Sequence, residues 1–91
     1  MIYSIGFTQQ AKADISLLKK SEPDAFKKLE KLLIEIIEHP TSGTGKPEKL
    51  RHELSDCYSR RITQKHRLVY QVFEDIVEIL VISAYKHYGD K

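Results

Sequence analysis

The chain has 91 residues, of which 41% are hydrophobic and 31% charged; such a composition excludes disordered and collagen-like classes and predicts a single globular domain over residues 1–91. The net charge is only +2, and the lone cysteine, Cys57, cannot form an internal disulfide, which favours a reducing, cytoplasmic location. No apolar run approaches the ~20 residues that span a membrane, so we expect no membrane contact.

The first half of the sequence predicts one strand and two helices. Residues 2–7 alternate apolar side chains, which is typical of a strand. Thr8 can cap a helix that begins at Gln9 and runs to about residue 20. A second helix is expected to begin near Ser21, which can cap it, and to end before Pro40.

The second helix carries an apolar stripe at helical spacing, which we expect to face the core. The stripe consists of Phe26, Leu29, Leu32, Leu33, Ile36 and Ile37. Charged residues between these positions are expected to point away from the core. They are Lys27, Lys28, Glu30, Lys31, Glu35 and Glu38.

After a loop rich in glycine and proline at residues 41–47, the hydrophobic period changes to two. This period predicts consecutive strands at residues 50–54, 57–63, 67–73 and 76–83. The last of these is apolar at nearly every position, as expected of a central strand buried on both faces. The order β-α-α-β-β-β-β predicts an α+β domain, with both helices on one face of a mainly antiparallel twisted sheet.

Charge is unevenly distributed along the chain. Residues 44–67 hold seven basic and three acidic side chains, a local charge of +4, so the remainder carries −2. A basic face of this kind is typical of proteins that bind nucleic acid. A solvated surface without a ligand is the plainer interpretation of the same charge.

Three arginines of this basic segment are placed by strand alternation. Arg60 lies on one side of its strand, whereas Ser59 and Arg61 lie on the other, so one of the two arginines should be exposed. Arg67 stands opposite them in the next strand of the hairpin. Guanidinium groups can grip phosphate oxygens through two donors. Surface ion pairs with nearby carboxylates are the alternative role.

Acid–base groups flank these arginines in the sequence. Glu48 follows a proline in the loop, His52 stands beside an arginine, and His87 and Tyr88 follow the last strand. Carboxylate and imidazole groups are the usual general bases and acids near neutral pH. His66 falls in a tight turn, where we expect it to face solvent. Taken singly, each of these groups could also be an ordinary solvated side chain.

In combination, these residues resemble the YoeB/Txe branch of the RelE toxin superfamily, over the whole chain and most strongly in its second half. The matching runs are Gly45-Lys46-Pro47-Glu48, Leu50, His52, Leu54-Ser55, Ser59-Arg60-Arg61-Ile62-Thr63, His66-Arg67-Leu68-Val69-Tyr70 and His87-Tyr88. The resemblance implies a RelE-like fold and a toxin of a bacterial type II toxin–antitoxin pair that cuts mRNA in the ribosomal A site.

The resemblance also implies roles for particular residues. Glu48 would accept the proton of the attacking 2′-hydroxyl, Arg67 would stabilise charge on the phosphate, His87 would be the general acid, and Tyr88 would orient the substrate. Residues implied to hold RNA are Lys46, Lys49, Arg51, His52, Arg60 and Arg61. The implied chemistry uses no metal and no other cofactor, and leaves a 2′,3′-cyclic phosphate.

The partners implied by the resemblance are a cognate antitoxin, the 70S ribosome with its mRNA, and a second copy of the chain. The antitoxin would be YefM/Phd-like, with an acidic disordered segment that orders on binding. Operator DNA would be reached only indirectly, through the antitoxin complex. Two alternatives remain at this point: a gyrase inhibitor like the ParE branch, which shares the fold without the nuclease residues, and a co-repressor without catalytic activity.

Overall fold

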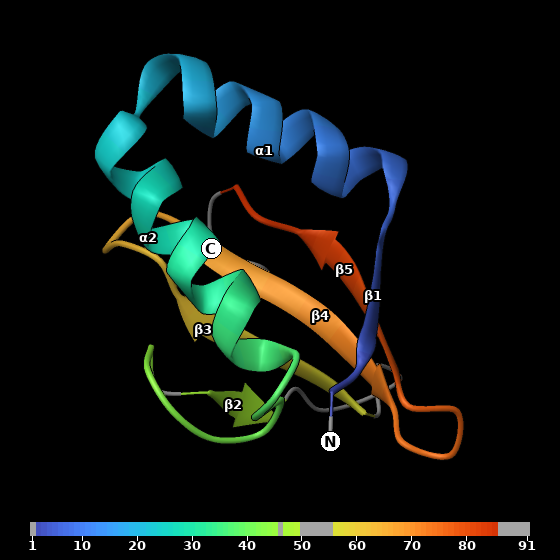
Figure 1. Ribbon diagram of the computed structural model, residues 1–91. Coiled ribbons are helices and arrows are strands. Elements are labelled where there is room, and N and C mark those ends of the chain that lie inside the picture. The colour runs from blue at the N-terminus through green and yellow to red at the C-terminus, as the bar shows by residue number, and fades with distance from the viewer. Residues whose placement is uncertain (1, 46, 50–55, 86–91) are drawn as a thin grey trace.

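The computed structural model describes residues 2–45, 47–49 and 56–85. Within these ranges, helices and strands follow the predicted order (Figure 1). Their bounds are β1 Ser4–Phe7, α1 Gln9–Ser21, α2 Pro23–Ile36, β2 Glu48–Lys49, β3 Cys57–Arg61, β4 Arg67–Phe73 and β5 Glu78–Ser83. No helix in this part of the chain is long and apolar enough to cross a membrane.

The five strands form one sheet in the order β1-β5-β4-β3-β2. All neighbours are antiparallel except β1 and β5, which are parallel. The mainly antiparallel α+β fold that the sequence predicted is therefore confirmed. β2 and β4 lie on either side of β3, and β2 forms the edge of the sheet farthest from β1. The candidate site described below lies on these strands.

The core lies between the two helices and one face of the sheet. Its buried apolar members are Ala11, Leu18, Ala25, Leu29, Leu32, Ile36, Ile62, Leu68, Tyr70, Val72, Ile79, Val81 and Ala84. The apolar stripe of α2 contributes to this set, as the helical spacing predicted. Asp14 of α1 is also buried, because its carboxylate accepts a hydrogen bond from the backbone N–H of Ala84 at 3.0 Å. This contact ties α1 to the chain beyond β5.

The two helices begin in different ways. Thr8 caps α1 as predicted, since its Oγ1 accepts a hydrogen bond from the N–H of Ala11 at 3.0 Å. The prediction that Ser21 caps α2 was wrong. Ser21 is the last residue of α1, its hydroxyl donates to the carbonyl of Leu17, and Glu22 takes the cap position of α2 without a side-chain cap.

Two of the predicted strands are shorter in the structure, and a third falls outside the described residues. β3 ends at Arg61 rather than residue 63, because the chain bends there and Thr63 Oγ1 accepts hydrogen bonds from the amides of Lys65 and His66 in the turn. β5 begins at Glu78 rather than residue 76, because Val77 has a positive φ of 54°. The strand predicted at residues 50–54 lies outside the described residues.

β5 is an inner strand, but it is not equally buried on both faces. Ile79 and Val81 face the helices and are 2% and 0% exposed. Leu80 and Ile82, on the other face, are only half-buried. The prediction of a strand buried on both faces was therefore wrong, since helices cover only one side of the sheet. The other side is the side on which the site is built.

Candidate active site

Glu48 and Arg67 lie together on the sheet face that the helices leave free. Glu48 pairs with Ser59 across β2 and β3, and Arg67 pairs with Arg61 across β3 and β4. The Arg67 guanidinium donates from Nε to Ser59 Oγ at 3.1 Å and from Nη2 to Glu48 Oε1 at 3.4 Å. Strand register therefore brings together a carboxylate and a guanidinium that are 19 residues apart.

The two members of this ion pair differ in exposure. The Arg67 side chain is 12% exposed and the Glu48 side chain 69% exposed. An exposed pair of this kind contributes at most about 1 kcal/mol to stability. The fold thus fixes the guanidinium firmly, while the carboxylate stays accessible to a ligand.

Ser59 is a site residue whose role the sequence did not predict. It is 2% exposed, and its hydroxyl accepts the Nε hydrogen of Arg67. This bond helps to orient the guanidinium, whose Nη2 reaches Glu48. The signal was present in the alternation of β3, which places Ser59 on the same side as Arg61.

Arg61 is the exposed member of the Arg60–Arg61 pair, as alternation required. It stands opposite Arg67, so two guanidiniums share the helix-free face. Lys49 is exposed as well, but it follows Glu48 in the strand, and successive side chains of a strand point to opposite faces. Its side chain therefore lies on the helix side of the sheet. Of the predicted RNA-binding residues that are described, Arg61 is the one that joins Glu48 and Arg67.

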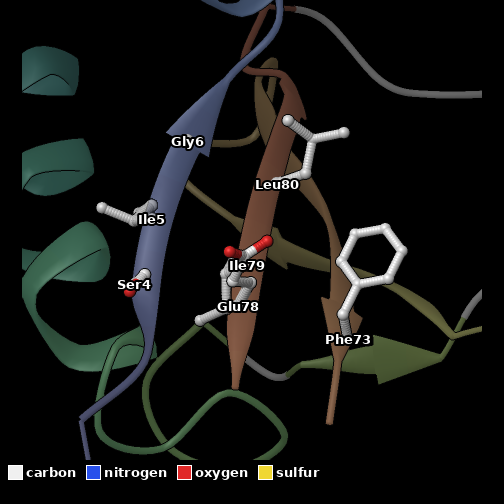
Figure 2. Close-up of a pocket in the computed structure, with 7 residues that line it drawn as sticks. All are labelled: Ser4, Ile5, Gly6, Phe73, Glu78, Ile79 and Leu80. Carbon is white, nitrogen blue, oxygen red and sulfur yellow. The ribbon is translucent and has the colours of Figure 1, made fainter. Parts of the chain in front are cut away.

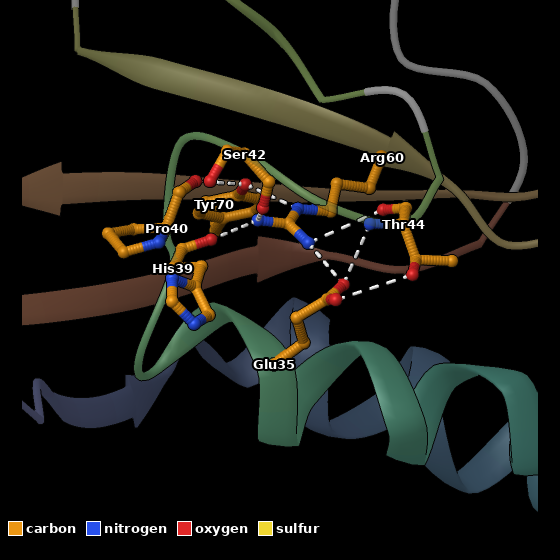
Figure 3. Close-up of polar contacts among 7 residues, drawn as sticks. All are labelled: Glu35, His39, Pro40, Ser42, Thr44, Arg60 and Tyr70. Carbon is orange, nitrogen blue, oxygen red and sulfur yellow. Dashed lines mark hydrogen bonds and ion pairs between the residues drawn. The ribbon is translucent and has the colours of Figure 1, made fainter.

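Arg60 does not offer its guanidinium to a ligand. The side chain is 0% exposed, and its N–H donors are used within the protein. Its acceptors are Tyr70 Oη, Glu35 Oε1 and the carbonyls of His39, Ser42 and Thr44 (Figure 3). The expectation that Arg60 contacts RNA is corrected on this ground. Glu35, expected to point to solvent, instead turns inward to meet it.

His66 is buried rather than exposed to solvent as its turn position suggested. Its Nε2 lies 2.9 Å from Glu22 Oε2, and its ring packs on Tyr85 with centroids 4.4 Å apart. The hydrogen bond from His66 lowers the pKa of the Glu22 carboxyl. The turn between β3 and β4 is thereby fixed to the helix junction, directly beside Arg67.

The remaining predicted site residues fall outside the described ranges. They are Lys46, Arg51, His52, His87 and Tyr88. Cys57, by contrast, is described and buried, and burial raises the pKa of its thiol. Since the thiolate is the nucleophilic form, Cys57 is not suited to covalent catalysis.

A pocket of about 260 Å³ lies away from this site, at the other edge of the sheet (Figure 2). It is lined by residues of β1, β5 and the end of β4. Phe73 and Leu80 point away from the helices, whereas Ile5 points toward them. No charged pair comparable to Glu48 and Arg67 is found among its described lining residues, so the β2–β3–β4 edge remains the candidate active site.

The sequence profile of the YoeB-like toxin of bacterial type II toxin–antitoxin systems matches residues 7–88. The chain belongs to the YoeB toxin family. "Toxin YoeB" of Escherichia coli K12 is 35% identical over 82 residues, covering 90% of this chain and 95% of that protein. "Toxin YoeB" of Mycobacterium bovis is 38% identical over 85 residues, covering 93% and 98%.

Solved structures of YoeB proteins share the fold. The YoeB dimer from Staphylococcus aureus is 37% identical with a TM-score of 0.84, and covers 97% of this chain and 100% of that one. A YoeB/ParE toxin from Agrobacterium tumefaciens is 29% identical with a TM-score of 0.87, covering 93% and 99%. The chain is thus a YoeB toxin of a type II toxin–antitoxin system, and its fold is that of the RelE and YoeB toxins.

Proposed function

We propose that this YoeB toxin is an endoribonuclease that cuts mRNA in the A site of the ribosome. The observation that carries the proposal is the Glu48–Arg67 pair, a carboxylate and a guanidinium 3.4 Å apart on the helix-free face. RNA cleavage by attack of the 2′-hydroxyl needs a base near that hydroxyl and fixed positive charge near the phosphate. Glu48 has the chemistry and the exposure expected of such a base, and Arg67 supplies fixed positive charge beside it.

In the proposed reaction, the Glu48 carboxylate takes the proton of the 2′-hydroxyl. The 2′-oxygen then attacks phosphorus while the bond to the 5′-oxygen breaks. His87 donates the proton that the leaving 5′-oxygen needs, so the products are a 2′,3′-cyclic phosphate and a 5′-hydroxyl. Arg67 stabilises the charge that builds on the phosphate, and Tyr88 orients the substrate. All four groups belong to the chain, and none of these steps needs a metal.

Arg61 is proposed to hold the RNA backbone beside Arg67. Lys46, Arg51 and His52 are proposed to extend this binding along the message, whereas Lys49, whose side chain lies on the other face of the sheet, is not. Arg60 is left out of the proposal, because its donors are already taken inside the protein. Replacing any one of the phosphate-binding cations by a neutral residue should weaken RNA binding and reduce its dependence on salt.

The proposed protein partners are an antitoxin and a second copy of the chain. The support comes from the Staphylococcus aureus relative, 37% identical, whose structures are described as a YoeB–YefM complex, a heterotetrameric YoeB–YefM complex and a YoeB dimer. An acidic antitoxin segment would suit the basic strands of this chain. Contact with operator DNA would then pass through the antitoxin.

The test is primer extension on a defined mRNA with purified protein, with and without 70S ribosomes. We expect cleavage at A-site codons that requires ribosomes and falls about 10²- to 10⁴-fold in Glu48→Gln. His87→Ala should show a comparable decrease. Glu38→Gln makes the same change at a carboxylate beyond α2 and should cleave like the wild type.

Undiminished cleavage by Glu48→Gln would remove Glu48 from the reaction. A folded wild-type protein that stops growth but cuts no mRNA, with or without ribosomes, would refute the nuclease. Supercoiling assays with DNA gyrase would then test the non-catalytic alternative directly.

A further inference from the structure

The loop at residues 39–45 and the side chain of Glu35 surround the buried guanidinium of Arg60, and together they are called the ring below. The loop after α2 passes from His39 to Gly45, and three of its carbonyls accept hydrogen bonds from Arg60 (Figure 3). The side chain of Glu35 closes the ring from α2, 2.8 Å from Arg60 Nη1. The N–H donors of a guanidinium point in fixed directions within one plane, and acceptors of the protein meet them here. The loop can therefore satisfy these donors in only one conformation.

Further bonds fasten the same loop to its surroundings. The Glu35 carboxylate also accepts a hydrogen bond from the N–H of Thr44 at 2.9 Å. The hydroxyl of Tyr70 accepts a hydrogen bond from Arg60 Nε and donates one to the carbonyl of Pro40 at 2.5 Å. Burial raises the pKa of the Tyr70 hydroxyl, so it remains a donor at neutral pH. One arginine of β3 thus organises both ends of the loop.

The loop reaches the site through Gly45. Its φ is +85°, and a Cβ there would lie 3.0 Å from the carbonyl oxygen of Arg61 and 3.2 Å from Cβ of Arg60. Its carbonyl accepts the N–H of Arg61 at 2.8 Å. The chain therefore lies directly on β3 shortly before it reaches Glu48.

Among the described residues, little else holds Glu48. Its strand, β2, has two residues, both exposed, and pairs with β3 at the edge of the sheet. Strands this short add little stability of their own, so the position of Glu48 depends on the chain that leads into it. That chain is the loop fastened by Arg60.

We propose that Arg60, with Glu35, is a positioning residue for the Glu48 base, and that its charge serves the loop rather than the RNA. This inference rests on the proposed function, because its effect is on the cleavage step. Displacing a catalytic group by about 1 Å can cost as much as 10²-fold in rate. Disruption of the ring should therefore lower kcat and leave substrate binding nearly unchanged.

The first test compares Glu35→Gln with Glu30→Gln in ribosome-dependent cleavage. Both replace a glutamate of α2, but Glu35 lies in the ring whereas Glu30 is exposed. In Glu35→Gln, an amide N–H₂ replaces one carboxylate oxygen and cannot accept the hydrogen bonds that Arg60 and Thr44 donate. We expect kcat to fall about tenfold with KM unchanged. Glu30→Gln should match the wild type in both constants.

The second test separates positioning from a general disruption of structure. In the Glu48→Gln background the base is already absent, so adding Glu35→Gln should cause no further decrease in kcat. Arg60→Lys keeps the charge but not the planar set of donors. A positioning role predicts that this variant too has a lower kcat, whereas a direct RNA contact predicts a raised KM with kcat kept.

The third test needs no cleavage and uses amide hydrogen exchange in the free protein. Glu35→Gln should speed exchange at Thr44 and Arg61 about tenfold, and leave Tyr70 in β4 unchanged. Equal exchange in both proteins, additive decreases in the double variant, or a change confined to KM would each overturn the inference. If the wild type cuts no mRNA, the proposed function fails, and the exchange result alone decides whether the ring holds this loop.

Discussion

The two faces of the sheet use the same residue type for opposite purposes. On the helix side, Arg60 is 0% exposed and its donors meet acceptors of the protein. On the free side, Arg67 is held by Ser59 and reaches an exposed carboxylate at 3.4 Å. Both arginines carry the same charge, but Arg60 meets enough internal acceptors to be a structural residue, whereas Arg67 keeps a donor at an exposed carboxylate and is the one proposed to act on RNA.

The largest expected effect comes from removing the charge on the helix side. Arg60→Met removes the cation that pairs with the Glu35 carboxylate and the donors to three loop carbonyls, and should lower the free energy of unfolding by about 3 kcal/mol. Arg61→Met, one residue along and exposed, should change it by less than about 0.5 kcal/mol. Urea denaturation of the two variants measures the difference, and similar decreases would show that Arg60 is no more important to stability than Arg61.

The next effect concerns the turn that carries the loop around Arg60. Gly43 has a φ of +115°, and a Cβ there would lie 2.8 Å from the Glu35 carboxyl carbon. Gly43→Ala should therefore cost about 2 kcal/mol through backbone strain and displacement of Glu35. Thermal unfolding tests this, and an unchanged melting temperature would show that Glu35 can move without cost.

A smaller, pH-dependent effect is expected at the second polar contact of the helix side. His66 lowers the pKa of Glu22 below its ordinary value of 4.5. Because the pKa of Glu22 is lower in the folded protein than in the unfolded chain, the ionised carboxylate stabilises the fold fully at pH values above the unfolded pKa. This stabilisation is lost as the pH falls through the folded pKa.

The free energy of unfolding should accordingly fall below about pH 4.5 more steeply in the wild type than in Glu22→Gln. Urea midpoints measured between about pH 7 and about pH 3 provide the comparison. The same slope in both proteins would show that the contact with His66 does not contribute in solution.

The smallest effect on stability is expected on the free side. Glu48 is 69% exposed in its pair with Arg67, so Glu48→Gln should change the free energy of unfolding by less than about 0.5 kcal/mol. The same variant is the one expected to lose cleavage. A large decrease in stability would mean that Glu48 is a structural residue like Arg60.

The fold followed from patterns that are local in the sequence. Helical spacing in α2, alternation in β3 and β4, and the Thr8 cap each depend on neighbouring residues, and each was confirmed. The facing positions of Arg61 and Arg67 also followed, because a short turn fixes the register of a hairpin.

The partner of Arg60 could not be found in this way. Alternation correctly separated Arg60 from Arg61, but it does not say which face is buried. Glu35 lies 25 residues away, on the charged side of α2, and nothing in its own segment marks it as an inward residue. His66 was mistaken for the same reason, since the groups that cover it come from the helix junction and from beyond β5.

The parallel pairing of β1 with β5 has a consequence for how the toxin is made. Thr8 donates a hydrogen bond to the carbonyl of Ile82, 74 residues later, so the first strand has its sheet neighbour only when β5 has been synthesised. Contacts this distant in sequence form slowly, because the entropy of closing a long loop is lost before the contacts stabilise the fold. The sheet is therefore completed late in folding, because its first strand in sequence pairs with its last.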